Sequence, residues 1–169
     1  MSLPVRALPA SVLLCSMLAV GVACSPPAPA FELGTGELEF EPLSDGDEIL
    51  VIHGPQGGYH LLASLRAVGI EAGSHLDLSD SSNPSFEIEV THAGVPLVVN
   101  GLFTQGMVPS DGSDPDWSHE TLGRLAILDI EDDSELVGEE IVFSAWIRPV
   151  TGPGYSDQLT LVVQPHPLN

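Results

Sequence analysis

The chain of 169 residues contains no lysine and only four arginines, against 24 aspartates and glutamates, so its formal net charge is −20. One of the arginines, Arg6, lies at the N-terminal end, which leaves only Arg66, Arg124 and Arg148 for the rest of the chain. Such a surface repels phosphate backbones, so the composition argues against nucleic-acid binding. It is also repelled by anionic membrane surfaces, so any membrane attachment has to rely on something other than a basic patch.

Cysteine is almost absent as well, since the chain contains only Cys15 and Cys24. No cysteine remains after residue 24, which excludes an internal disulfide, a thiolate metal site and a thiol nucleophile in the body of the protein. The sequence also lacks a Gly-x-Ser-x-Gly elbow, a His-Glu-x-x-His metal motif and a phosphate-binding loop. We therefore expect a protein that is not an enzyme.

The N-terminal segment is typical of an export signal. A single positive charge at Arg6 precedes an apolar run over residues 11–24, which is short for a membrane span of about 20 residues. A Pro-rich stretch over residues 25–30 follows, and it cannot continue a helix. We predict a signal peptide over residues 1–23, a Pro/Ala-rich tether over 24–34, and one domain over 35–169.

The tetrapeptide Gly21-Val-Ala-Cys24 resembles the lipobox of bacterial lipoproteins, although that family usually has Leu where this chain has Gly21. The resemblance implies that Cys24 is acylated, for example with palmitate, and becomes the mature N-terminus. In bacteria with two membranes it favours an exported protein anchored to the outer membrane. The turn at residues 45–47, together with residues 54–60, also looks like a motif of exported bacterial lipoproteins of unknown function.

The body of the chain shows the patterns of short strands. An apolar run at Ile49–Ile52 enters a Gly/Pro turn, and an alternating arm leaves it at Tyr59–Val68, so we expect this hairpin at the centre of the fold. Alternation in the arm and at Phe86–His92 directs one apolar set of side chains inward. The other predicted strands are residues 37–41 with Leu38 and Phe40 inward, 75–79, 97–103 with a bulge near Gly101, 122–130, 141–148 with Phe143 inward, and 158–164.

Seven to nine short strands separated by turns predict an all-β protein, an antiparallel sandwich or barrel. The C-terminal part, residues 138–148 followed by a Gly/Pro loop and residues 157–163, looks like the last hairpin of bacterial immunoglobulin-like domains. That resemblance implies an immunoglobulin-like antiparallel β-sandwich. The chain lacks the cysteine pair and the tryptophan spacing of antibody domains.

Two groups of residues could bind a metal ion. If the loop of the central hairpin runs from Gly54 to Tyr59, His53 and His60 face each other and could chelate copper or zinc, with a third ligand from His75, His92, His119 or an acid. The alternative is that both histidines only support the turn. The polar loop at residues 105–120 carries Asp111, Asp114, Asp116 and Glu120, which are hard oxygen ligands suited to calcium. The alternative there is an ordinary solvated turn, because the spacing does not fit an EF-hand.

A third candidate site is a contact surface. Alternation with Phe143 and Ile147 directs Trp146 and Arg148 away from the core, where an aromatic ring beside an arginine suits a partner. We therefore predict a lipid-anchored binding or structural module of the bacterial envelope, without a cofactor, that contacts another envelope protein or a polysaccharide. The alternative function is an exported metal-binding lipoprotein that holds copper, zinc or calcium.

Overall fold

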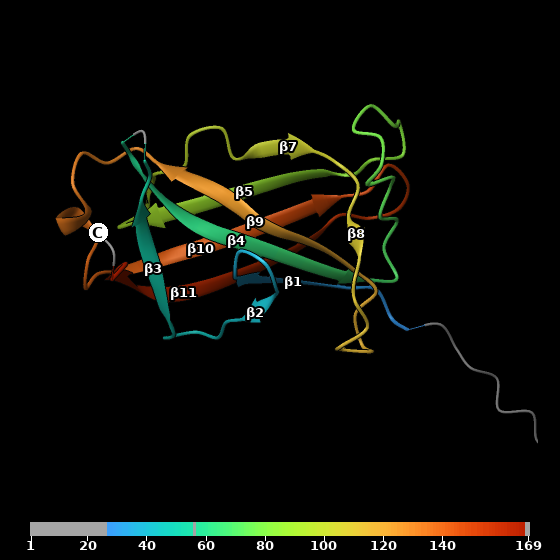
Figure 1. The fold of residues 1–169 in the computed structure, drawn as a ribbon, viewed down its shortest axis with the longest axis horizontal. Coiled ribbons are helices and arrows are strands. Elements are labelled where there is room, and N and C mark those ends of the chain that lie inside the picture. The colour runs from blue at the N-terminus through green and yellow to red at the C-terminus, as the bar shows by residue number, and fades with distance from the viewer. Residues whose placement is uncertain (1–26, 56, 168–169) are drawn as a thin grey trace, which may run out of the picture.

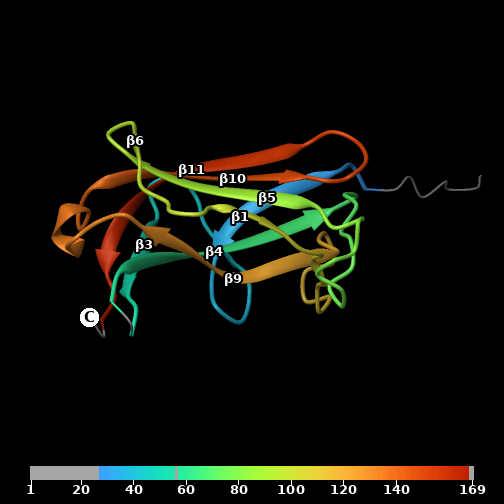
Figure 2. The ribbon, with the colours of Figure 1, turned by 90° about the horizontal axis from the view of Figure 1, so that it is seen from above.

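A computed structural model of the chain describes residues 27–55 and 57–167, so the predicted signal peptide and Cys24 lie outside the described residues. The fold is all-β, as predicted, with eleven strands connected into one sheet that folds over into two layers (Figures 1 and 2). Seven strands have six or more residues, and four short ones have two or three. The one helical element among the described residues is a single 3₁₀ turn, Asp133–Glu135. No helix in this part of the chain is long and apolar enough to cross a membrane.

The first layer is built around β4, the second arm of the predicted central hairpin. This strand pairs with β1 and β3 along one edge and with β9 along the other, all antiparallel. The short strands β2 and β8 extend the layer beyond β1 and β9. The bounds of these strands are β1 Ala30–Thr35, β2 Glu41–Pro42, β3 Glu48–His53, β4 Tyr59–Val68, β8 Val108–Pro109 and β9 His119–Leu128.

The second layer has β10 at its centre, between β5 and β11, and the short β6 and β7 both pair with β5. The bounds are β5 Ser85–His92, β6 Val95–Pro96, β7 Leu102–Thr104, β10 Glu140–Arg148 and β11 Tyr155–Pro165. On one side β3 pairs in parallel with β11, and on the other Val98 bridges to Leu128 of β9. These two connections join the layers along both sides of the sandwich (Figure 2).

The core lies between the layers and is filled by the alternate side chains that the sequence pattern directs inward. Leu61 and Leu65 of β4 are fully buried, and so are Phe86 of β5 and Phe143 of β10. The ring of Phe103 stacks on Phe86 with 5.0 Å between the ring centroids and an interplanar angle of 12°. The inward faces predicted from alternation at β4, β5 and β10 are therefore confirmed.

The chain enters the fold earlier than the sequence indicates. Strand β1 begins at Ala30, inside the segment predicted to be a tether, and Leu33 is fully buried. Thr35 then pairs with Glu41, so residues 36–40 form the loop of a hairpin and the strand predicted at 37–41 is wrong. Gly36 adopts a φ of +102° in this turn, a conformation that other residues rarely adopt. Leu38 is consequently exposed at the tip of the loop.

Two other predicted strands are also corrected. Residues 75–79 form turns, because Asp77 and Asp80 accept hydrogen bonds from the backbone two residues further on, which replaces strand pairing. The strand predicted at 97–103 is not continuous, because within it only the isolated Val98 bridge and the first two residues of β7 pair with a neighbour. At Gly101 the backbone runs against Ile88, whose N–H donates to the Gly101 carbonyl at 3.0 Å. A side chain at this position would collide with the Ile88 carbonyl, so the chain needs glycine there.

Candidate functional site

The outer face of the first layer is divided into a covered half and a bare half. The outward side chains of β4 lie in a line along this face, with His60 and Leu62 in one half and Arg66 in the other. The loop between β1 and β2 and the loop between β8 and β9 fold over the Arg66 half. Nothing in the described part of the chain covers the half around Leu62 in the same way, since Leu125 and Ile127 beside it are 55% and 48% exposed.

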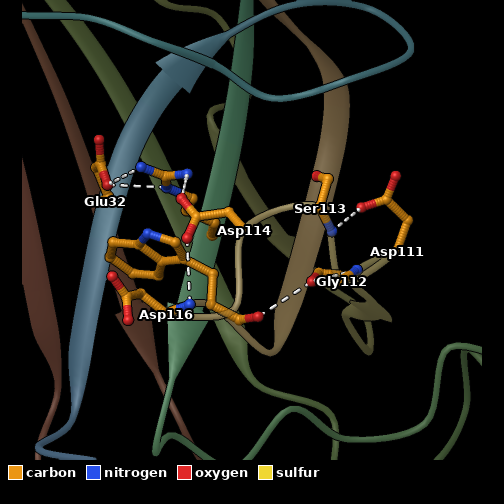
Figure 3. Close-up of polar contacts among 9 residues, drawn as sticks. Glu32, Asp111, Gly112, Ser113, Asp114 and Asp116 are labelled. Atoms are coloured by element: carbon orange, nitrogen blue, oxygen red, sulfur yellow. Dashed lines mark hydrogen bonds and ion pairs between the residues drawn. The ribbon is translucent and has the colours of Figure 1, made fainter.

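Arg66 holds the covered half together. Its guanidinium lies between two aromatic rings, 4.2 Å from the centroid of Phe40 and 4.5 Å from that of Trp117. The same group forms ion pairs with Glu32 of β1 at 2.8 Å and with Asp114 at 3.0 Å (Figure 3). Stacking and multiple pairing are the interactions for which arginine is suited. Arg66 therefore fixes both loops to the sheet, and its charge is already matched by two carboxylates.

The acidic loop predicted as a calcium site is organised by its own hydrogen bonds. Asp111 accepts from the Ser113 N–H at 2.8 Å, and Asp114 accepts from the Asp116 N–H at 3.1 Å while it also pairs with Arg66 (Figure 3). The Ser113 hydrogen bond lowers the pKa of Asp111. These carboxylates serve as turn and ion-pair acceptors, which matches the solvated-turn alternative.

Glu120 lies on β9 beside this loop, opposite Arg66 in the pairing of β4 with β9. Burial raises the pKa of Glu120, the charge of Asp111 raises it further, and Arg66 opposes both. A groove of about 480 Å³ runs between the two loops, with Leu38, Phe40 and Trp117 among its lining residues. Glu120 and Asp111 therefore repel each other across the groove, and the charge of Arg66 offsets part of that repulsion.

The predicted pairing of the two hairpin histidines is wrong. His53 pairs with Tyr59, while His60 pairs with Ile52. Because directly paired residues share a face and neighbouring residues alternate, His53 and His60 point to opposite faces of the hairpin. The ring of His53 lies 5.0 Å from that of Tyr59. The loop is one residue shorter at its far end than the prediction required, and a one-residue change of register exchanges the faces.

The other histidines do not restore a metal site. Within residues 27–55 and 57–167, no three His, Cys, Asp or Glu side chains lie together as ligands of one ion. Burial lowers the pKa of His60, and burial followed by the charge of His75 lowers that of His119. His92 lies 3.7 Å from Glu139. The copper or zinc site predicted at His53 and His60 therefore loses the shared face on which it was based.

Trp146 and Arg148 lie on the outer face of the second layer, as alternation predicts. Trp146 is half-buried and is paired with Glu87 of β5 and Ser156 of β11. Arg148 donates to Glu87 at 3.1 Å. Most neighbours on this face are polar, namely Glu89, Thr91, Ser144, Gln158 and Thr160, and Val142 and the exposed Leu102 lie among them. The side chains predicted as a contact point thus lie in a face that is mainly polar.

The bare half of the first layer carries a set of apolar side chains that we name the apolar patch: Leu50, Ile52, Leu62, Leu125 and Ile127, with His60 among them. Cross-strand pairs place Ile52, His60 and Ile127 in one row and Leu62 and Leu125 in the next. A groove of about 440 Å³ borders the patch, and Leu43, Leu50, Ile52 and Leu62 contribute to its lining.

The apolar patch could have been predicted from runs of consecutive apolar residues in the sequence. Residues 125–128 of β9 are apolar at every position, so the strand is apolar on both faces, and only one of those faces can line the core. Ala126 and Leu128 are buried, which leaves Leu125 and Ile127 outside. The same reasoning applies to residues 49–52, where alternate positions are buried. A continuous apolar run in a strand of a two-layered sandwich therefore predicts apolar side chains on the outer face as well as in the core.

Comparison with known proteins gives no relative for this chain. No protein-family model matches it, and neither the curated proteins nor the solved structures contain a significant match.

Proposed function

We propose that this protein is a lipid-anchored, non-enzymatic binding module of the bacterial envelope, which holds another envelope protein against the apolar patch of its first layer. The anchor is the acylated Cys24 implied by the lipobox-like segment, and the location is the outer membrane. The immunoglobulin-like arrangement implied by the C-terminal hairpin belongs to the same proposal.

The observation that carries the proposal is the contrast between the apolar patch and the rest of the molecule. The chain has a formal charge of −20, and its acids lie in loops and also on outward positions of strands, such as Glu87 and Glu89 of β5 and Glu48 of β3 at the border of the patch. The two rows of paired residues from Ile52 to Ile127 and from Leu62 to Leu125 contain no acid. Contiguous exposed apolar side chains of this kind mark interaction sites in soluble proteins.

The chemistry of the patch favours a protein partner over a polysaccharide. Its members are aliphatic, and aliphatic side chains contribute through loss of water-exposed apolar area, which a sugar offers only in part. One indole that could stack on a sugar ring, that of Trp117, is already packed against Arg66. Half-buried His60 contributes a neutral imidazole, because burial lowers its pKa.

Anchoring is tested by replacing the acylated residue. Cys24→Ala should leave the signal peptide attached and abolish incorporation of a radioactive or clickable fatty acid in growing cells. Cys15→Ala is the matched control, since Cys15 lies within the predicted signal peptide and its replacement should leave labelling unchanged. Fatty-acid labelling that survives Cys24→Ala would refute the anchor.

The contact surface is tested by photo-crosslinking in cells. A photoreactive amino acid at Leu125, in the apolar patch, should give one discrete adduct, whereas the same group at Glu89, on the polar face of the second layer, should give none. A photoreactive group at Ile127 should give the same adduct as at Leu125. Adding Leu125→Asp to that protein should remove the adduct, because a charge in an apolar interface is unfavourable. Leu125 is exposed, so this substitution should leave the fold intact. Equal adducts from Leu125 and Glu89 would contradict the proposed surface.

A further inference from the structure

The loop between β4 and β5, residues 69–84, is ordered by a dense set of hydrogen bonds and yet exposes its two leucines. Leu76 is 86% exposed and Leu78 is 73% exposed. Asn83, only 4% exposed, accepts from the Ser74 N–H at 2.7 Å and donates to the Asp77 carbonyl at 2.8 Å. The loop is therefore held in one conformation around Asn83 with both leucines outside it. Two leucines that an ordered loop holds in water are placed to contact an apolar surface outside the protein.

This loop lies at the end of the sandwich where the chain enters from its N-terminal segment. Gly69, the first residue of the loop, packs against the backbone of Pro27 and Pro29, so closely that a Cβ atom at position 69 would lie 3.1 Å from the Pro29 Cα. The first residue of β1, Ala30, pairs with Val68 of β4 directly before the loop. Figures 1 and 2 both show the loop and the start of β1 at the same end of the molecule.

The turn between β10 and β11 adds a third apolar side chain to this end. Val150, at 57% exposure, lies in that turn, and the neighbouring Thr151 donates to Glu71 from its N–H at 3.2 Å and from its hydroxyl at 2.7 Å. Glu71 belongs to the β4–β5 loop, so the two segments are joined. We name Leu76, Leu78 and Val150 together the apolar tip.

The distance along the chain from the predicted anchor, Cys24, to the folded domain is short. Only three peptide units separate Cys24 from Pro27, which span at most about 11 Å when fully extended. An acyl chain on Cys24 would therefore keep this end of the sandwich close to the lipid headgroups rather than at the end of a long tether. The early start of β1 at Ala30 makes this constraint tighter than the predicted tether of residues 24–34 would.

We propose that the apolar tip rests in the surface of a zwitterionic bilayer beside the lipid anchor, so that the sandwich stands on the membrane with β6 at its far end. This inference rests on the proposed acylation of Cys24. A single acyl chain gives only weak attachment to a membrane. Leucines that enter the boundary between headgroups and acyl chains strengthen that attachment. The apolar patch would then lie on the side of the module, where an envelope partner can reach it.

The acids of this end determine which bilayer it suits. The carboxylate of Asp77 accepts from the N–H and hydroxyl of Ser79, and that of Asp80 accepts from the N–H and hydroxyl of Ser82, so both are turned toward the loop itself. These hydrogen bonds lower the pKa of each carboxyl, which keeps both ionised at neutral pH. The tip therefore favours zwitterionic lipid, and anionic lipid should weaken its insertion.

The test uses the mature protein as isolated from growing cells, reconstituted with phosphatidylcholine vesicles, with an environment-sensitive fluorophore on one introduced cysteine. Leu76→Cys and Leu78→Cys place the probe on the tip, and Val95→Cys, 58% exposed on β6 at the opposite end, is the matched control. Probes at 76 and 78 should emit at shorter wavelength on vesicles than in buffer and should be quenched by brominated lipid. The probe at 95 should show neither change. Including phosphatidylglycerol should reduce both changes at 76 and 78.

A second variant separates insertion of the loop from insertion of the dye. Adding Leu76→Asp to the Leu78→Cys protein should return the emission of its probe toward that of the Val95 control. Vesicle flotation distinguishes the two proposals from each other. Protein that floats while its probes at 76 and 95 give equal spectra would overturn the membrane-facing tip and leave the anchor intact. Protein that does not float would overturn both.

Discussion

Ser64 offers a direct test of how the first layer is assembled. Alternation places it on the outward set of β4, yet it is fully buried. The register of β4 against β9 shifts between Ala63 and Leu65, so β9 bulges beside Ser64 and, together with the β1–β2 loop, covers it. The Ser64 hydroxyl donates to the Gly36 carbonyl at 2.7 Å and accepts from the Gly123 N–H at 3.0 Å. One side chain thus joins β4 to the β1–β2 loop and to the bulge of β9.

Ser64→Ala removes both hydrogen bonds and adds no volume. It leaves the N–H of Gly123 and the carbonyl of Gly36 without this partner, and each buried group left unsatisfied costs about 1–3 kcal/mol. The carbonyl retains some capacity to find another donor, so we expect a total loss of about 2–4 kcal/mol in the free energy of unfolding. With a urea dependence of about 2 kcal/mol per molar, the midpoint should fall by about 1–2 M.

Urea denaturation followed by tryptophan fluorescence measures this loss. Ser144→Ala is the matched control, because Ser144 is 4% exposed but its hydroxyl has only a long contact of 3.4 Å with the side chain of Gln158. The control should lose less than about 1 kcal/mol, since the contact is too long for a strong hydrogen bond. Equal losses at the two serines, or a loss at Ser64 within about 0.5 kcal/mol, would contradict the role given to Ser64.

The core, the acidic loop and the hairpin each provide one more prediction. Leu61→Ala and Phe143→Ala should each lower the free energy of unfolding by about 2–5 kcal/mol because both side chains are fully buried, whereas Glu87→Ala, on the mainly polar face, should stay within about 0.5 kcal/mol; equal losses at Leu61 and Glu87 would contradict the assignment of faces. Glu120→Gln should raise the melting temperature at pH 7. Because the pKa of Glu120 is raised in the folded protein, folding favours the protonated carboxyl. The stability that this carboxyl contributes is present at low pH and is lost as pH rises through the folded pKa. An equal gain from Glu120→Gln at pH 3 would argue against this origin. Zn²⁺ and Cu²⁺ titrated at neutral pH should leave the melting temperatures of the wild type and of His60→Ala equal, because His53 and His60 lie on opposite faces; a rise that His60→Ala abolishes would show that the two do share a metal.

The comparison of sequence and structure separates patterns that are local from pairings that are not. Alternation identifies β4, β5 and β10 together with their inward faces, because a period of two residues is a property of the strand itself. The same alternation at residues 37–41 is misleading, since a strand also needs a neighbour and these residues lie mostly in the loop that Gly36 begins. For the histidines the difference is one residue of register, which depends on how β3 meets β4 and not on either strand alone.

Composition and local pattern are enough to define the class of the protein. The scarcity of basic residues, the cysteines confined to the first 24 positions and the short alternating runs describe an acidic, all-β chain whose N-terminal segment resembles an export signal. Which outward side chains gather depends instead on the tertiary structure. Arg66 is far along the chain from Asp114, and Leu62 is far from Leu125, yet the folded sheet brings each pair together. Local sequence determines to which face of its own strand a side chain points. The side chains beside it depend on long-range strand pairing, so the composition of a site is decided only in the folded protein.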